Sequence, residues 1–227
     1  RNETPLAGNR TDFYRVRKFG LEEDTSLDSK YQEFIQWVDV DYFMDYLIAQ
    51  SYFANGDMFN QKYWRTEDYS IKWRPIYYDL DLALGSSSPT RNILPNYFNP
   101  EGIPSQDGSL TNMDLYVGLR KNAGWCQAFG ERYVYVALNY FNPERVIGIL
   151  DEMVSTMEPE MSRHIKRWGT PSSISEWKSN VKDLRDCLEK RQSHALTYLQ
   201  REFGFSDAQM QEWKAKATAS AIPQTNQ

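Results

Sequence analysis

Several features that would place this 227-residue chain in a particular class of protein are scarce or missing. Only 2 cysteines are present, so at most one disulfide can form, and we interpret Cys126 and Cys187 as small buried apolar side chains. The 31 acidic residues outnumber the 26 basic ones and no basic run is seen, so the charge gives no reason to expect nucleic-acid binding. No apolar stretch is long enough to span a bilayer.

Aromatic residues, by contrast, are abundant. The 7 Trp, 15 Tyr and 11 Phe supply material for a real apolar core, which excludes disorder of the whole chain. The first residue is Arg1 rather than Met and no signal-peptide pattern follows it, so we interpret the chain as a mature or excised piece of a longer product. We predict an irregular N-terminal arm over residues 1–30, in which a short helix is left open, a main domain over 31–217 and a disordered tail over 218–227.

Helical patterns occupy most of the chain. Apolar residues at 40, 43, 44, 47, 48 and 52 share one helix face, and Asp39 or Asp41 is suited to cap a helix that stops at Asn55-Gly56. Residues 85–111 are rich in Gly, Ser, Pro and Asn and predict a long loop. Capping residues and periodicity predict further helices over 112–122, 125–141, 143–157, 159–168, 173–203 and 206–217.

Two short aromatic and β-branched segments, 61–66 and 71–78, predict a β-hairpin around a polar turn at 67–70. In an antiparallel ladder without bulges, the residue numbers of two paired residues would add up to roughly 137. Residue 58 would then lie opposite 79, and residue 60 opposite 77. The fold class that follows is mainly α with a small β-hairpin, that is, α+β.

The open end of this hairpin gathers acidic and amide side chains. Asp57 and Asn60 precede the first strand, and Asp79 and Asp81 follow the second, where an extended chain would point both carboxylates to one face. Carboxylates this close repel one another unless a cation or a proton intervenes. Oxygen ligands without His or Cys suit Mg²⁺, Mn²⁺ or Ca²⁺ rather than zinc, and the commonest task of Mg²⁺ held in this way is to bind nucleotide phosphates.

The order of helix, polar loop, hairpin and Asp before a glycine is that of the C-terminal lobe of a protein kinase. The chain resembles the spore coat protein H (CotH) kinase family over about residues 30 to 205, in the stretches VDVDYFMDYLIAQSYFANGD, NQKYWR, KWRPIYYDLDLALG and EWKSNVKDLRDCLEKRQSHALTYLQREFG. The resemblance implies an atypical protein-kinase-like C-terminal lobe with Asp57 as the catalytic residue. It also implies that Asn60 and either Asp79 or Asp81 bind metal.

The same resemblance implies the reaction and its setting. We expect transfer of the ATP γ-phosphate to Ser or Thr of a coat or surface protein, with Mg²⁺ or Mn²⁺, in an extracellular, cell-surface or spore-coat location. We expect a monomer without a membrane span or a nucleic-acid partner, and we assign no nucleotide-binding residue.

Two other functions stay open. No Gly-rich loop and no strand-borne Lys paired with a helical Glu is evident before residue 39, so the chain can also be interpreted as a degenerate kinase lobe that serves as a non-catalytic surface binding module. The clustered oxygen ligands can also be interpreted as a purely structural calcium site.

Overall fold

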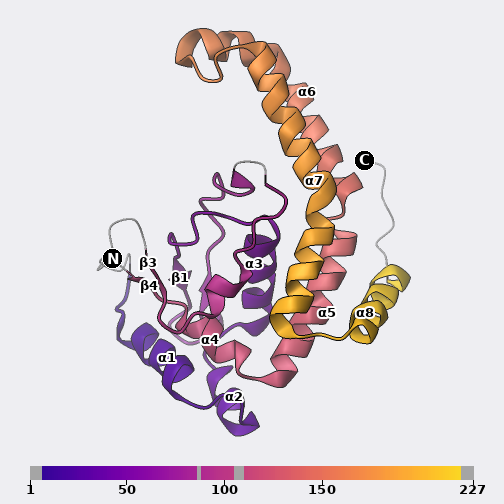
Figure 1. The fold of residues 1–227 in the computed structure, drawn as a ribbon. Coiled ribbons are helices and arrows are strands. Elements are labelled where there is room, and N and C mark those ends of the chain that lie inside the picture. Colours follow the sequence, from indigo (N-terminus) through magenta and orange to yellow (C-terminus); the bar gives the residue numbers. More distant parts are fainter. Residues whose placement is uncertain (1–6, 86–87, 105–109, 221–227) are drawn as a thin grey trace. The chain divides into compact units, whose positions relative to one another are not determined.

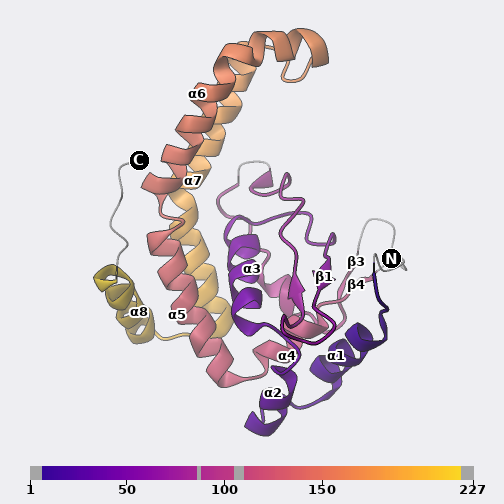
Figure 2. The same cartoon turned by 180° about the vertical axis from the view of Figure 1, so that it is seen from behind.

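The fold, taken from a computed structural model, is described for residues 7–85, 88–104 and 110–220 (Figures 1 and 2). The described residues divide into two compact units: those within 1–83 and 92–132, and those within 84–91 and 133–227. Within the described part of the chain, eight α-helices accompany two hairpins built from two-residue strands. The predicted class, mainly α with a small β component, is confirmed.

Two helices fill most of the segment that we predicted to be an irregular arm. Helix α1 spans Thr11–Glu22 and helix α2 spans Asp28–Phe34. The prediction was wrong because it treated Gly20 as a break in the pattern, whereas this glycine is a packing contact inside α1. A Cβ added at Gly20 would lie 2.9 Å from the ring of Phe34, and one added at Gly118 would lie 2.7 Å from the Gly20 Cα.

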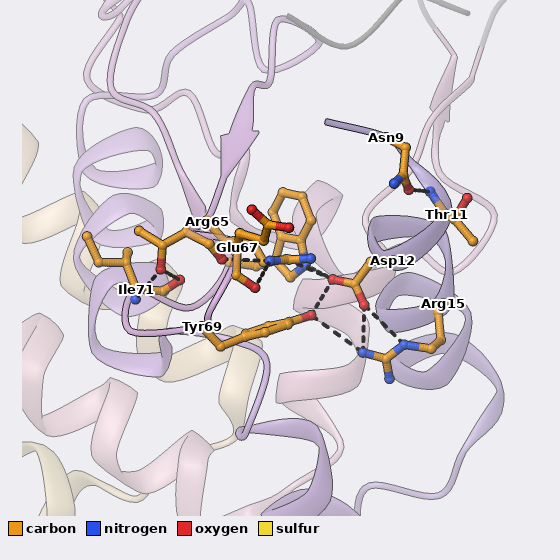
Figure 3. A network of polar contacts seen from close by, with 10 residues as sticks. Asn9, Thr11, Asp12, Arg15, Arg65, Glu67, Tyr69 and Ile71 are labelled. Carbon is orange, nitrogen blue, oxygen red and sulfur yellow. Dashed lines mark hydrogen bonds and ion pairs between the residues drawn. The ribbon is translucent and has the colours of Figure 1, made fainter. Parts of the chain in front are cut away.

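Helix α1 is anchored to the hairpin turn through Asp12 (Figure 3). The Asp12 carboxylate accepts hydrogen bonds from nitrogen atoms of Arg15, Arg65 and Trp73 at 2.8, 2.9 and 3.0 Å, and from the hydroxyl of Tyr69. Burial alone would raise the pKa of this carboxyl group, but the hydrogen bonds, that of Tyr69 first, lower its pKa to about 2. The N-terminal segment is therefore part of the first unit's structure.

Helix α3 spans Val40–Tyr52 and begins where predicted. The Asp39 side chain caps it by accepting a hydrogen bond from the Tyr42 backbone nitrogen at 3.2 Å. Arg74 forms an ion pair with the same carboxylate, so this arginine has a structural partner. The buried face of α3 packs into an aromatic core whose fully buried members include Phe34, Phe43, Leu47, Ile48, Tyr97, Tyr116, Trp125 and Phe129.

The predicted hairpin is present, but its strands are shorter than expected. Strand β1 is Tyr63–Trp64 and strand β2 is Arg74–Pro75, with Tyr63 opposite Pro75 and Trp64 opposite Arg74. These pairs are one residue out of the register that we predicted. Next to the turn, the Thr66 nitrogen donates to the Ile71 carbonyl oxygen at 3.1 Å, which is the predicted register.

The shift in register arises at Trp73. Its backbone nitrogen donates to Trp37 and its carbonyl oxygen accepts from Asp39, at 2.8 and 3.0 Å, so this residue pairs with the segment before α3 instead of with β1. The second strand therefore carries one extra residue relative to the first.

The segment that we predicted to be a long loop, 85–111, contains short elements. A 3₁₀-helix, η2, covers Leu94–Phe98, and strands β3 (Ile103–Pro104) and β4 (Leu110–Thr111) form a second hairpin. Helices α4 (Asp114–Arg120) and α5 (Ala123–Asn139) follow.

The second unit contains long helices. Helix α6 spans Pro143–Trp168, α7 spans Ile174–Phe203 and α8 spans Asp207–Ala219, with α6 and α7 side by side (Figures 1 and 2). The break that we predicted before Pro159 is wrong: α6 continues through this proline, and its packing along α7 offsets the lost hydrogen bond and the clash of the proline ring.

The helix ends of this unit agree with the sequence. Asn142, Ser173 and Ser206 each accept a hydrogen bond from a backbone nitrogen of the first turn, and Gly204 ends α7 with a φ of 68°. Helix α8 enters the predicted tail by two residues, and positions 221–227 of that tail lie outside the described residues. Both cysteines are free. None of the helices in the described ranges combines the length and apolar character needed to cross a membrane.

Candidate functional site

The candidate site begins in the loop that follows α3. Ala54 turns the chain with a φ of 47°, and Asn55 is buried, with 2% of its surface exposed. The Asn55 side-chain nitrogen donates to the Gln50 side-chain oxygen at 2.9 Å, and its Oδ1 accepts from the Asp57 backbone nitrogen at 3.1 Å. Because a buried amide holds it, the backbone at Asp57 is fixed relative to the end of the helix.

A second loop, which follows β2, lies against the first. The Asn55 side chain also donates to the Asp79 carbonyl oxygen at 3.4 Å, and the Gly56 nitrogen donates to the Leu82 carbonyl oxygen at 3.1 Å. Asp79 has a φ of 58°, in the left-handed region that Asp adopts more readily than most residues. Backbone strain of this kind is typical of functional sites, where the surrounding contacts hold it in place.

Asn60 joins the two loops through their side chains. Its Nδ2 donates to Asp57 Oδ2 at 2.7 Å and to Asp79 Oδ2 at 2.8 Å. The structure therefore brings together three of the four side chains that the sequence singled out. Asp57 and Asn60 are half-buried, whereas Asp79 is exposed, so solvent and solutes reach the cluster from the Asp79 side.

Asp81 is not part of this cluster. Its side chain is exposed and contacts no partner within the part of the chain that the structure describes. We expected Asp79 and Asp81 to share one face of an extended strand, and that expectation is wrong. Strand β2 already ends at Pro75, and the left-handed backbone of Asp79 and the turn after it remove the alternation of an extended chain.

The donor set defines which metal the cluster would suit. Within the described ranges, no group of three or more His, Cys, Asp or Glu side chains converges, so no all-carboxylate cage is formed there. Asp79 and the Asn60 amide provide one carboxylate and one neutral oxygen, and the Asp57 carboxylate lies beside them. This set fits Mg²⁺ or Mn²⁺ better than Ca²⁺, because Mg²⁺ in proteins is bound by one or two carboxylates and completed by water and phosphate oxygens.

From the sequence, Asn55 was predicted to end a helix, and a share in the roles of the polar loop was left open for it. The structure shows it as the buried tie between the two loops, with hydrogen bonds to Gln50, Asp57 and Asp79. A signal for the Asp57 contact was present in Asn-Gly-Asp, because an Asn side chain often binds the backbone two residues on. The predicted hairpin already placed this loop beside residue 79, but it did not indicate which side chain of the loop would bond there.

Comparison with known proteins bears on this geometry. A family model described as CotH kinase protein matches residues 9–195, a range that includes all of the residues of the candidate site. Searches of curated proteins and of solved structures gave no match. The matched range covers most of the 227 residues and agrees with the resemblance seen in the sequence. The chain therefore belongs to the CotH kinase family.

Proposed function

We propose that this chain carries the catalytic C-terminal lobe of an atypical protein kinase, which transfers the γ-phosphate of ATP to a Ser or Thr hydroxyl of a protein. One observation supports this proposal: Asn60 Nδ2 bonds to the carboxylates of both Asp57 and Asp79, which come from two separate loops. Membership of the CotH kinase family supports a kinase-like domain. The acceptor residue and the metal dependence are part of the proposal.

Asp57 is suited to be the general base. Its backbone is bonded to Asn55 and its side chain to Asn60, so the carboxylate is oriented before a substrate arrives. In the proposed reaction the substrate hydroxyl oxygen bonds to the γ-phosphorus while the bond from that phosphorus to the β–γ bridging oxygen breaks. ADP leaves, and the hydroxyl proton moves to the Asp57 carboxylate.

Asp79 and Asn60 would hold the divalent ion. A bound Mg²⁺ or Mn²⁺ would neutralise negative charge on the nucleotide phosphates. Asp79 contributes an exposed carboxylate. Asn60 contributes its amide oxygen once its nitrogen turns away from Asp79 and keeps only the bond to Asp57. No residue is assigned to the nucleotide base.

Transfer of labelled γ-phosphate to an acceptor protein, or to the kinase itself, tests the proposal in the full-length product with Mg²⁺ or Mn²⁺. Asp57→Ala and Asp79→Ala should each reduce the rate at least about 100-fold. Asp68→Ala is the matched control, because this exposed carboxylate lies in the hairpin turn and accepts hydrogen bonds from the backbone nitrogen and the hydroxyl of Ser70. Full activity in both site variants would show that the site is wrong.

A non-catalytic surface module is the second candidate, and one observation favours it. The described residues that precede α3 form helices α1 and α2 rather than a β-sheet of the kind that covers ATP in protein kinases. A thermal-shift measurement separates the two functions. ATP with Mg²⁺ should raise the unfolding midpoint of a kinase, because a ligand that binds only the folded state stabilises it, whereas no shift at saturating nucleotide favours the binding module.

The setting is also proposed. We place the substrate among coat or cell-surface proteins and the chain in an extracellular, surface or spore-coat location, on the basis of the family alone. Fractionation of the producing cells, with detection of the chain in the secreted or surface fraction, tests the location separately from the activity.

A further inference from the structure

The second unit exposes large apolar side chains along one helix. Within its described residues, the exposed large apolar side chains all lie on α6 or next to its start: Tyr140, Ile149, Met153, Met157 and Trp168. By contrast, the only residue of α6 that is buried is Met161. Isolated exposed apolar residues are ordinary, but a concentration on one helix indicates a surface that meets a partner.

Three of these side chains form a continuous ridge. Ile149, Met153 and Met157 follow one another at intervals of four residues, which places them on the same side of a helix. Their exposed fractions are 44%, 58% and 53%. Methionine is flexible and polarizable, so a ridge with two methionines adapts readily to an apolar surface.

Helix α7 covers a different side of α6. Ion pairs connect Asp151 with Arg185 and Glu158 with Lys178, the latter at 2.8 Å. Asp151 and Glu158 lie roughly 150° around the helix from Met153. The ridge is therefore not the surface through which α6 packs on α7.

The ridge is complementary to itself. A two-fold axis through Met153 would place Ile149 of one copy opposite Met157 of an antiparallel second copy, and Met153 opposite its own equivalent.

Charges beside the ridge obey this symmetry as well. Arg145 lies near the start of α6 and Glu160 lies at a nearly equal interval beyond Met153, both exposed and on the ridge side of the helix. Two antiparallel copies would bring each Arg145 close to the Glu160 of the other. Glu160 also pairs with Arg163 of its own helix at 2.9 Å, and 65% of its side chain stays exposed.

We infer that the ridge is an interface between two copies of this chain, which associate through antiparallel α6 helices about an axis at Met153. Such an arrangement places the α6–α7 pairs of both copies in a four-helix assembly, in which the apolar ridges cover each other. This inference replaces the monomer that we expected from the sequence. It does not depend on the proposed kinase activity, because none of the residues in the ridge belongs to the candidate site.

Sedimentation equilibrium of the 227-residue chain tests the association. The wild-type chain should form dimers with a dissociation constant below about 100 μM, the range of weak, small interfaces. Met153→Glu should raise this constant at least about 100-fold, since it brings two like charges together at the axis. Ser155→Glu is the matched control: it adds the same charge to an exposed position on the far side of α6 and should change nothing.

Two outcomes of this experiment overturn the inference. A wild-type chain that stays monomeric at every concentration shows that the ridge is not an interface between two copies. A dimer that Met153→Glu leaves intact shows that the interface lies elsewhere. Far-UV circular dichroism of each variant checks that helix content is unchanged, so that loss of the dimer is not loss of the fold.

Charge reversal and cross-linking test the antiparallel geometry. Arg145→Glu and Glu160→Arg should each weaken the dimer roughly 10-fold, and the double variant should return to within about 3-fold of wild type. Met153→Cys should form a covalent dimer on mild oxidation, whereas Ser155→Cys should not. Additive losses in the double variant, or equal cross-linking at both positions, would contradict the two-fold arrangement.

Discussion

Two polar clusters in the first compact unit, one around Asp12 and one around Asp57 and Asp79, compensate their carboxylates in opposite ways. The Asp12 carboxylate is bonded to Arg15 and Arg65 and to two further donors, so its charge is fully compensated by the protein (Figure 3). Asp57 and Asp79 share a single neutral amide, that of Asn60. A carboxylate whose charge is already balanced by cationic side chains acts as a structural anchor. A carboxylate that has only a neutral partner remains available to bind a ligand.

The largest effect on stability is expected at the anchor. Asp12→Asn should lower the free energy of unfolding by about 2–3 kcal/mol, because it leaves two guanidinium groups and a tyrosine hydroxyl around a neutral side chain. Urea denaturation measures this loss. Asp28→Asn is a suitable control, since Asp28 occupies the first turn of α2 as Asp12 does in α1, without such a network. An equal loss in both variants would show that only the helix dipole is involved.

Acid should weaken the same anchor. The pKa of Asp12 is about 2 in the folded chain and 3.8 ordinarily, so between these pH values the unfolded chain binds a proton that the folded chain does not. Its contribution, up to about 2 kcal/mol, is complete above about pH 4 and is lost as the pH falls toward 2. The free energy of unfolding, measured by denaturation at each pH, should decrease more steeply between pH 4 and pH 2 for wild type than for Asp12→Asn. An equal decrease in both would contradict the assignment.

A smaller effect is expected when metal is added to the other cluster. Mg²⁺ at several times its dissociation constant should raise the free energy of unfolding by about 1 kcal/mol. Asp79→Asn should abolish this gain, and Asp12→Asn should preserve it. If wild type and Asp79→Asn gain equally, the ion binds at another position and the contrast between the two clusters fails.

The smallest effect should come from neutralising the candidate site itself. Asp57→Asn and Asp79→Asn should each change the free energy of unfolding by less than about 0.5 kcal/mol, or raise it, because each removes a like-charge repulsion. Asn keeps an acceptor for Asn60 and tolerates the left-handed backbone at position 79. Asn55→Ala provides the contrast: it should lower the free energy of unfolding by about 2 kcal/mol, because it removes the hydrogen bonds of a buried side chain.

Much of the second unit was predictable because its signals are local. Asn142, Ser173 and Ser206 cap helices through hydrogen bonds within one turn, and Gly204 ends one by its backbone conformation. Helix α1 was missed for the opposite reason. Whether a glycine such as Gly20 breaks a helix or lets two segments approach depends on its neighbours in space, which sequence spacing does not show.

The sequence by itself determined the family, the helix-rich class and the set of side chains from which a site can be built, because residue types, caps and short turns act over a few positions. Only the tertiary structure decided that Asp79 joins Asp57 and that Asp81 does not. That choice depends on Asn55 and on the bond between Gly56 and Leu82, contacts between loops separated by the whole hairpin, and on the left-handed backbone that they hold in place.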